Sequence, residues 1–233
     1  MEGLPGHSPA RCGADRPGDG GGVLSARKIV FWRHGQTIWN LEHRFQGRTD
    51  IPLDETGRTQ AKTAARLLAG MRPDAIVSSD LMRARDTAGE LAAITGLPVA
   101  TDPRLQERSG GEWEGLTGEE IRSRYPAEWA IWEPVGGEAE TDLGERVAAA
   151  VTDALSTLPD EQTLVVASHG GAIRAGLAVL LGLPPAVWGR LGPLSNCSWS
   201  VVGEAPAGWR ATGWRLLEHN AGTLPEPVLS DDR

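Results

Sequence analysis

Two histidines each follow an apolar run and precede a glycine, a pattern that predicts one shared catalytic site. The run Ile29–Trp32 ends just before His34, and the run Leu164–Ala167 ends just before His169. Short apolar runs that end in a glycine-containing turn are typical of buried strands. In open α/β sheets, ligands bind beyond the carboxyl ends of the strands, where residues distant in sequence meet. We therefore expect His34 and His169 to lie in the same site.

The residues around His34 favour binding of a phosphate-like anion. Arg33 supplies a permanent planar cation that suits bidentate phosphate recognition. Gly35 lets the backbone turn and approach a ligand closely, and Thr37 and Asn40 add a hydroxyl and an amide close to backbone amides that favour anions. A histidine after a strand is by itself more often structural, so these neighbours carry the prediction of an oxyanion cradle beside a nucleophile.

Two other segments offer charged groups to the same crevice. Arg83 lies in the first turn of a helix that follows the strand expected at 75–77, although a solvated helix face is the simpler interpretation. Glu107 follows another short strand and could donate a proton if burial and nearby negative charge raise its pKa. The neighbouring acids Glu112 and Glu114 are expected at the surface, but the residue pattern alone does not choose among the three carboxylates.

Strand and helix patterns alternate around these residues. Further strands are expected at 97–100, 196–202 and 209–216. Helices are expected after N-caps at Thr56, Thr117 and Thr141, over about 81–95 with Gly96 as its end, and over about 171–181. The helix after Thr117 should open with a capping box that includes Glu120. This order predicts a three-layer α/β/α sandwich with a mostly parallel central sheet.

One domain is expected over residues 27–218, because no internal linker interrupts the pattern and 233 residues can bury one large core. Residues 1–26 combine Gly, Pro and charged residues without apolar periodicity, so a disordered N-terminal tail is expected. Alternatively, translation begins near Val23 or Leu24. A loosely ordered C-terminal tail is expected over 219–233.

Composition and charge exclude several classes of protein. The formal net charge of -8 argues against nucleic-acid binding. No apolar run approaches the roughly 20 residues that span a bilayer, and the N-terminus lacks a secretory signal. Cys12 and Cys197 offer neither a disulfide framework nor metal-ligand spacing. We expect a cytoplasmic protein that binds no nucleic acid, membrane or metal, with its nine tryptophans mostly in the core or in pocket walls.

Four motifs resemble the signatures of the histidine phosphatase superfamily, the phosphoglycerate mutase-like proteins. They are Arg33-His34-Gly35-Gln36-Thr37, Ser79-Asp80-Leu81-Met82-Arg83-Ala84, Leu105-Gln106-Glu107 and Ser168-His169-Gly170-Gly171. One such motif is weak evidence, whereas four in the order of the family are strong. The resemblance covers about residues 27–218 and implies the phosphoglycerate mutase-like fold.

The resemblance also implies roles for individual residues. His34 would attack phosphorus and become a phosphohistidine, while Arg33, Arg83 and His169 would hold the phosphoryl oxygens. Glu107 would protonate the leaving alkoxide and then help to activate water. No metal or other cofactor is implied, because fixed cations would do the electrostatic work. Further contacts to a small phosphorylated metabolite are expected from Thr37, Asn40, Gln46, Gly47 and Gly170.

Within the family, the choice lies between phosphatase and mutase. The segment 39–45 resembles the mutases, whereas 111–117, 124–126 and 136–138 resemble the phosphatase branch, and the longer mutase insertion is missing. Without that insertion a phosphoenzyme is harder to shield from water, so hydrolysis of a small sugar or glycerate phosphate is expected. A phosphoglycerate mutase is the alternative, and a homodimer is possible by analogy with the family.

A looser resemblance narrows the substrate class. Residues 136–138 and 194–199 are similar to the actinobacterial glucosyl-3-phosphoglycerate phosphatases, a group within this family. Three arginines could then select an additional carboxylate or be exposed solubilising charges, namely Arg44, Arg48 and Arg108. Asn196 and Trp199 could likewise contact a sugar or belong to an ordinary strand.

Overall fold

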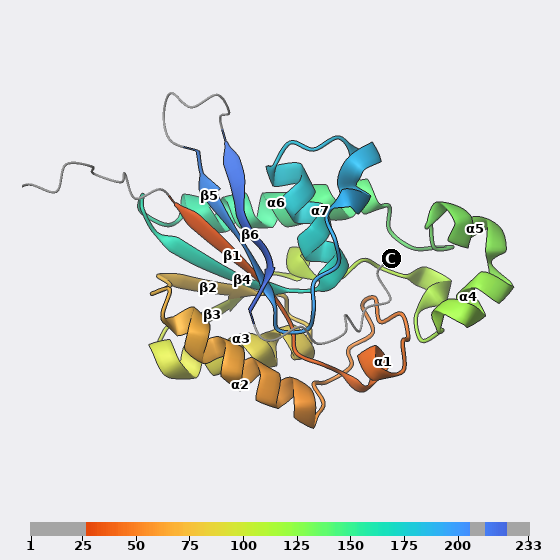
Figure 1. The fold of residues 1–233 in the computed structure, drawn as a ribbon, viewed down its shortest axis with the longest axis horizontal. Helices are drawn as coiled ribbons and strands as arrows, with labels where there is room; N and C mark the ends of the chain where they lie inside the picture. Colours follow the sequence, from red (N-terminus) through yellow and green to blue (C-terminus); the bar gives the residue numbers. More distant parts are fainter. Residues whose placement is uncertain (1–26, 206–212, 223–233) are drawn as a thin grey trace, which may run out of the picture.

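The computed structural model describes residues 27–205 and 213–222. The tail expected over 1–26 lies outside the described residues, as do 223–233 and the first part of the strand expected at 209–216. The described chain forms one six-stranded sheet with helices on both faces (Figure 1). None of its helices is long and apolar enough to cross a bilayer.

The sheet is mostly parallel, as expected, with one reversed strand. Its order is β3-β2-β4-β1-β5-β6, in which β3, β2, β4 and β1 pair in parallel and β5 is antiparallel to both of its neighbours. The strands are β1 (Lys28–Arg33), β2 (Ala75–Ser78), β3 (Val99–Thr101), β4 (Thr163–Ser168), β5 (Trp199–Glu204) and β6 (Trp214–Ala221). The central strands β2, β4 and β1 therefore end side by side at one edge.

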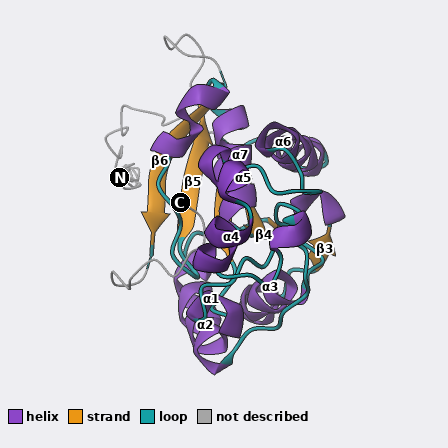
Figure 2. Ribbon diagram, turned by 90° about the vertical axis from the view of Figure 1, so that its right-hand side faces the viewer, coloured by secondary structure: helices purple, strands orange, loops and turns teal. Residues whose placement is uncertain are grey.

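Two pairs of helices cover the sheet and complete the three expected layers. They are α2 (Glu55–Ala69) and α3 (Met82–Thr95) on one face, and α6 (Glu140–Ser156) and α7 (Gly170–Leu180) on the other (Figures 1 and 2). Alternation along β1 serves both layers: Ile29 and Phe31 pack with α6 and α7, while Val30 and Trp32 pack with α2 and α3. A strand buried on both faces explains the continuous apolar run before His34.

Two helix caps differ from those expected. The N-cap of α2 is Asp54, whose carboxylate accepts a hydrogen bond from the Gly57 N–H at 2.7 Å, and Thr56 lies inside the first turn. Asp and Thr are both favourable caps, so the local pattern could not choose between them. The cap expected at Thr141 is also wrong, because α6 starts at Glu140 without a side-chain cap.

The last two strands also have shifted ends. β5 begins at Trp199 and not at 196, because the chain still turns at Cys197, which has a φ of 57°. β6 continues to Ala221, so residues 219–221 belong to the sheet and not to the expected tail. The Ser200 hydroxyl holds this end, since it contacts His219 Nδ1 at 2.9 Å and accepts from the Asn220 N–H at 3.3 Å.

A smaller group of elements lies beyond the carboxyl ends of the strands, at the right of Figure 1. It comprises a 3-10 turn (Gly111–Trp113), α4 (Gly118–Arg124) and α5 (Pro126–Ile131), and α4 opens with the expected capping box. We call residues 111–132 the aromatic lobe. The fully buried Trp113 lies edge-on to Phe45 at 5.9 Å between ring centroids. The lobe therefore has a small core of its own, close to the ends of the central strands.

The remaining short elements connect these layers. They are α1 (Ile38–Leu41) and the 3-10 turns Pro103–Leu105 and Pro185–Arg190.

Candidate active site

The two strand-end histidines lie next to each other, as the sequence predicts. β1 and β4 are neighbouring parallel strands, and Arg33 pairs in register with Ser168. The residues that follow them, His34 and His169, have ring centroids 5.2 Å apart. The His34 N–H also donates to the Ser168 carbonyl at 3.0 Å, which extends the ladder by one bond. The main chain of the sheet therefore fixes the distance between the two imidazoles.

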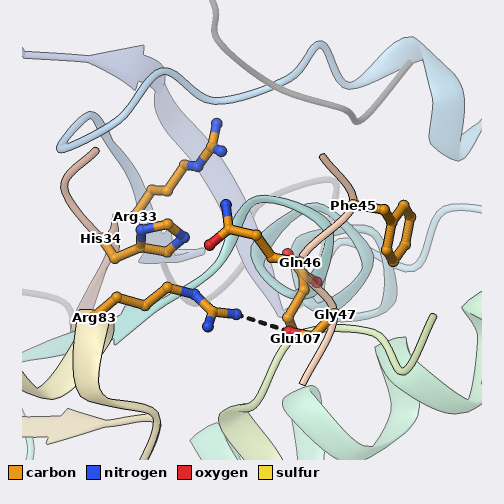
Figure 3. Close-up of a pocket in the computed structure, with 7 residues that line it drawn as sticks. All are labelled: Arg33, His34, Phe45, Gln46, Gly47, Arg83 and Glu107. Atoms are coloured by element: carbon orange, nitrogen blue, oxygen red, sulfur yellow. Dashed lines mark hydrogen bonds between the residues drawn. The ribbon is translucent and has the colours of Figure 1, made fainter. Parts of the chain in front are cut away.

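Four of the five residues implied as catalytic line one small pocket. The lining residues are Arg33, His34, Phe45, Gln46, Gly47, Arg83 and Glu107, all shown in Figure 3. His169 stands directly behind His34 and is fully buried. Phe45 is a pocket residue that the sequence analysis did not predict, although it precedes the predicted contact Gln46.

His34 is held as a neutral imidazole with one defined tautomer. Its Nδ1 lies 2.7 Å from the carbonyl oxygen of Gly35, which can only accept, so Nδ1 carries the proton and donates. Burial lowers the pKa of His34 well below its ordinary value, and the cations Arg83 and then Arg33 lower it further. Nε2 of the neutral ring therefore keeps its lone pair, which is the form that a nucleophile needs.

His169 is also neutral, with the opposite tautomer. Arg83 Nε donates to His169 Nδ1 at 3.2 Å, so the proton of the ring lies on Nε2 and is donated to the Ser79 hydroxyl at 2.9 Å. Burial is the main cause of the lowered pKa of His169, followed by repulsion from Arg83 and His34. His169 thus connects Arg83 to the sheet edge through Ser79.

Arg83 is held from a second side by the loop 46–50. Its two terminal nitrogens donate to the carbonyls of Thr49 at 2.9 Å and of Gly47 at 2.7 Å, and the second of these bonds is dashed in Figure 3. The side chain is fully buried in the first turn of α3. Arg83 is therefore part of the site and not on a solvated helix face, and its planar guanidinium is oriented by fixed acceptors.

Arg33 is a buried cation, and its Nε donor has no hydrogen-bond partner among the described residues. Its side chain is 2% exposed and Nη1 donates to the carbonyl of Leu194. Its Nε, which is also buried, has no hydrogen-bond partner among residues 27–205 and 213–222. Buried donors are nearly always paired in proteins, so this unpaired N–H indicates a place for an anionic ligand.

Glu107 is the carboxylate that faces the pocket. Its Oε2 accepts from the N–H of Gly171 at 3.0 Å, and its Oε1 accepts from the N–H groups of Ala172 at 2.9 Å and Arg108 at 2.8 Å. The first two donors belong to the first turn of α7, where the helix dipole favours a negative charge. These bonds hold the carboxyl group in one orientation at the pocket.

The other two candidate acids lie elsewhere. Glu112 is exposed, as expected, and accepts from the Tyr125 hydroxyl at 2.7 Å. Glu114 is half-buried rather than at the surface, and it accepts hydrogen bonds from the loop 46–50 and from Gly110. Geometry therefore makes the choice that the residue pattern left open, because Glu107 alone of the three lines the pocket.

The remaining predicted contacts divide into two groups. Gln46 and Gly47 line the pocket, whereas Thr37, Asn40 and Gly170 do not. Thr37 and Asn40 form a capping box for α1, and the Thr37 hydroxyl lies 3.0 Å from Gln46 Oε1. These two residues therefore stand behind Gln46 and orient it. Gly170 is the first residue of α7, next to His169.

The three arginines considered for a substrate carboxylate have protein partners. Arg44 donates to the Gly115 carbonyl at 2.7 Å, and the buried Arg108 donates to carbonyls of Glu138 at 2.7 Å and Trp132 at 3.0 Å. Arg108 is therefore not an exposed solubilising charge. Arg48 is the most exposed of the three and makes a longer contact, 3.3 Å, with Glu138.

Asn196 has a structural role, in which its amide hydrogen-bonds to other parts of the chain. It is buried before β5, and its amide donates at 3.2 Å both to the His34 carbonyl and to Asn40 Oδ1. Trp199 is a buried residue of β5 within the core that faces α2 and α3. Within the described chain, no group of three or more His, Cys, Asp or Glu residues is arranged to hold a metal ion.

Comparison with known proteins agrees with this geometry. Residues 29–217 match the family model described as "Histidine phosphatase superfamily (branch 1)". The chain is 41% identical over 214 residues to the glucosyl-3-phosphoglycerate phosphatase of Mycobacterium tuberculosis, a match that covers 85% of this chain and 96% of that protein. It is 39% identical over 216 residues to the probable phosphoglycerate mutase GpmB of Yersinia pestis, covering 88% of this chain and 98% of that protein.

Solved structures give the same relationship. A mycobacterial glucosyl-3-phosphoglycerate phosphatase in complex with VO3 matches with a TM-score of 0.79 and 40% identity, covering 84% of this chain and 100% of that chain. A putative alpha-ribazole-5'-P phosphatase from Escherichia coli matches with a TM-score of 0.71 and 25% identity, covering 86% of this chain and 100% of that chain. The expected phosphoglycerate mutase-like fold is confirmed.

Proposed function

Because the chain belongs to branch 1 of the histidine phosphatase superfamily, we propose that it is a phosphomonoesterase that forms a phosphohistidine on His34. One observation carries the proposal. His34 Nδ1 carries the ring proton and donates a hydrogen bond to the Gly35 carbonyl. The lone pair of Nε2 is therefore available in a pocket lined by Arg33 and Arg83. A neutral imidazole beside two permanent cations is suited to attack a phosphate ester.

The proposed reaction has two displacements at phosphorus. In the first, His34 Nε2 bonds to phosphorus while the bond to the ester oxygen breaks, and Glu107 passes the proton of the phosphate monoester monoanion to the leaving alkoxide. In the second, water attacks the phosphohistidine and one of its protons passes through Glu107 to the phosphate, which leaves inorganic phosphate, the neutral imidazole and the ionised carboxylate. Arg33 and Arg83 stabilise the charge on the non-bridging oxygens in both steps, and His169 contributes through Arg83, whose Nε it binds.

The hydrogen bond from Nδ1 has a further use in this mechanism. When Nε2 bonds to phosphorus, the ring becomes cationic, and the Gly35 carbonyl that accepts from Nδ1 at 2.7 Å stabilises that charge. The negative phosphoryl oxygens lie between this charge and the cations Arg33 and Arg83 in the proposed intermediate, so the charges of the site are balanced.

We propose a small sugar or glycerate phosphate as the substrate, with glucosyl-3-phosphoglycerate as the first candidate. The names of the mycobacterial relatives support this choice. Glucosyl-3-phosphoglycerate carries the glycerate carboxylate besides its phosphate. Arg48, with 43% of its side chain exposed and only a 3.3 Å contact to Glu138, is the arginine that could turn toward that carboxylate at least cost.

A phosphoglycerate mutase is the second candidate, because relatives named as probable mutases match over nearly the same length. The two activities share the phosphohistidine and differ in the group that accepts the phosphoryl. A mutase returns it to a second hydroxyl of the glycerate, whereas a phosphatase passes it to water.

The experiment that separates these candidates is phosphate release by the purified protein in EDTA from a panel of esters. The panel includes glucosyl-3-phosphoglycerate, 3-phosphoglycerate and α-ribazole phosphate, with a parallel assay for interconversion of 2- and 3-phosphoglycerate. We expect release from one sugar or glycerate phosphate far above the others. Interconversion without release would instead identify a mutase.

We extend the proposal to the cellular location and the oligomeric state of the enzyme. Phosphorylated sugars and glycerates are charged and cross membranes poorly, so the proposed substrate implies a cytoplasmic enzyme. We also propose a homodimer by analogy with the family. Sedimentation of the full chain tests the second point.

A further inference from the structure

Glu114 lies outside the pocket, yet its carboxylate accepts four hydrogen bonds from segments close to the site. It accepts from the N–H groups of Arg48, Thr49 and Gly110, each at 3.0 Å, and from the Thr49 hydroxyl at 2.5 Å. An ionised carboxylate offers about four acceptor positions, so these donors use its full capacity. Two segments distant in sequence, the loop 46–50 and Gly110, converge on this one side chain.

The loop that Glu114 holds is the loop that orients Arg83. The peptide unit between Gly47 and Arg48 is trans, so its N–H and C=O point in opposite directions. Glu114 Oε1 accepts from this N–H, and the C=O of the same unit accepts from Arg83 at 2.7 Å. The peptide plane is therefore clamped between a carboxylate and a guanidinium, and each of the two bonds polarises the other.

Thr49, two residues after Gly47, also contacts both side chains, here through two successive peptide units. Its N–H and hydroxyl donate to Glu114 Oε2, and its carbonyl accepts from Arg83 Nη1 at 2.9 Å. Both carbonyl acceptors of Arg83 thus belong to residues whose adjoining N–H groups bind Glu114. The Ile51 N–H also donates to the Thr49 carbonyl at 3.1 Å, and the Thr49 N–H also donates to the Gln46 carbonyl at 3.1 Å, so Glu114 reinforces turns within the loop itself.

Gly47 is needed for this close approach. It has a φ of 51°, and a Cβ built on it would overlap Oε1, Cδ and Cγ of Glu114. The backbone conformation and the space both require glycine. The presence of Gly47, predicted as a substrate contact, is explained at least as directly by its contact with Glu114.

We propose that Glu114 is a positioning residue that sets the orientation of the Arg83 guanidinium, and with it the affinity of the pocket for a phosphoryl group, through the loop 46–50. The proposal rests on the proposed function, because it takes the pocket to be a phosphate site. Glu114 does not line the pocket, so its effect on phosphate is transmitted by the two peptide carbonyls and Arg83.

The test uses inorganic phosphate as a probe, titrated calorimetrically into the full-length protein, so that the readout does not depend on turnover. Glu114→Gln has nearly the same shape but turns an amide NH2 toward N–H donors and loses part of the acceptor set. We expect phosphate binding to weaken about 10-fold, which corresponds to about 1.4 kcal/mol. The matched control is Glu112→Gln, in the exposed acid two positions earlier, which should bind phosphate as the parent does.

Repeating the measurement in an Arg83→Lys variant distinguishes positioning of Arg83 from a general structural effect. Arg83→Lys keeps the positive charge but cannot bridge both carbonyls, so adding Glu114→Gln to it should change phosphate affinity less than about 2-fold. Equal losses in the two backgrounds, unchanged affinity in Glu114→Gln, or the same loss in Glu112→Gln would each overturn the proposal.

Two further results keep the test decisive. If Glu114→Gln fails to fold, Thr49→Val removes one of the four bonds, and we expect a smaller loss of phosphate affinity with the same dependence on Arg83; an unchanged affinity would overturn the proposal. If the parent protein itself does not bind phosphate, the proposed phosphate site fails. That result is distinct from a parent that binds phosphate and a Glu114→Gln variant that binds it equally well.

Discussion

The pocket has two walls that are held in place by different interactions. The sheet-edge wall consists of Arg33, His34 and Arg83, on the left of Figure 3. His169 contacts His34 and Arg83 of this wall. The loop wall consists of Phe45, Gln46, Gly47 and Glu107. The first is fixed by strand pairing and burial between helix layers. The second is fixed by side-chain hydrogen bonds, since Glu114 accepts from the Arg48 N–H and the Thr37 hydroxyl donates to Gln46 Oε1.

This difference separates the residues that carry out the reaction from those that adjust its rate or its choice of substrate. Moving Arg33 or His34 requires disrupting the paired ends of the central strands, whereas the guanidinium of Arg83 also depends on the loop 46–50. The loop wall depends on a few polar contacts, each worth roughly 1 to 3 kcal/mol when a charged group takes part. Changes in the sheet-edge wall should therefore abolish the reaction, whereas changes in the loop wall should scale it or alter the choice of substrate.

The largest effect is expected for His34→Ala in the sheet-edge wall. Loss of the nucleophile should lower kcat at least about 10⁴-fold, as is typical for an essential catalytic group. The assay is phosphate release from the best ester of the panel. The control is His43→Asn, in an exposed histidine with a φ of 55° that asparagine tolerates, and it should retain activity. Comparable activity in His34→Ala would show that the mechanism is wrong.

A smaller and selective effect is expected for Glu107→Gln in the loop wall. Removal of the proton donor should slow an alkyl phosphate by about 10² to 10⁴-fold. The loss should be much smaller for p-nitrophenyl phosphate, because p-nitrophenolate leaves without a proton. Steady-state kcat/KM for both esters gives the ratio, because it reports the release of the leaving group and not the hydrolysis step that both esters share, and Glu112→Gln is the matched control. Equal losses of activity for both leaving groups would show that Glu107 is not the general acid.

The two buried histidines should make stability fall in mild acid. Burial lowers the pKa of both His34 and His169 in the folded chain, whereas the unfolded chain takes up protons near pH 6.5. As the pH drops below about 6.5, the free energy of unfolding should decrease by up to about 1.4 kcal/mol per pH unit for each histidine, until the pH reaches the folded pKa values.

Urea unfolding at a series of pH values measures this slope. The parent chain should lose stability between pH 7 and the acidic limb, and His34→Ala should lose it less steeply because one of the two buried imidazoles is gone. The acid limb of kcat/KM should also lie below pH 6.5, since the free enzyme needs a neutral His34. A stability that is independent of pH in this window would contradict the burial argument.

The smallest effect is expected for Arg48→Ala at the rim of the loop wall. If Arg48 binds a substrate carboxylate, KM for a glycerate-type ester should rise about 3 to 10-fold, while KM for p-nitrophenyl phosphate should stay within about 2-fold. Arg58→Ala, on the exposed side of α2 with 54% of the side chain exposed, serves as the control. Equal changes for both esters would mean that Arg48 does not select the carboxylate.

The same two walls show how far the sequence alone could predict the site. Apolar runs that end at His34 and His169 predict the sheet-edge wall, because strand periodicity and strand ends are local features. Arg83 has a simpler local interpretation as an exposed residue, and the family motif was needed to identify it. The fold class follows from the alternation of elements, whereas the cap at Asp54 did not, because a neighbouring Thr was an equally good local candidate.

The loop wall was less predictable because its contacts join distant residues. The role of Glu114 depends on N–H groups of Arg48 and Thr49, more than sixty positions earlier, and no periodicity links them. Asn196 is a similar case, since its partners His34 and Asn40 lie on another strand end and on α1. A polar residue that binds backbone groups leaves no mark in the local pattern, so its role appears only in the folded chain.

The central claim is that His34 carries the phosphoryl group on Nε2. The direct measurement is rapid acid-free quenching of the enzyme with substrate in turnover, followed by intact mass and peptide mass spectrometry and by ³¹P NMR of the trapped species. We predict one phosphoryl group per chain on His34, attached to Nε2 and absent from His34→Ala. Turnover with no phosphoryl group on His34, or the same labelling in His34→Ala, would contradict the account.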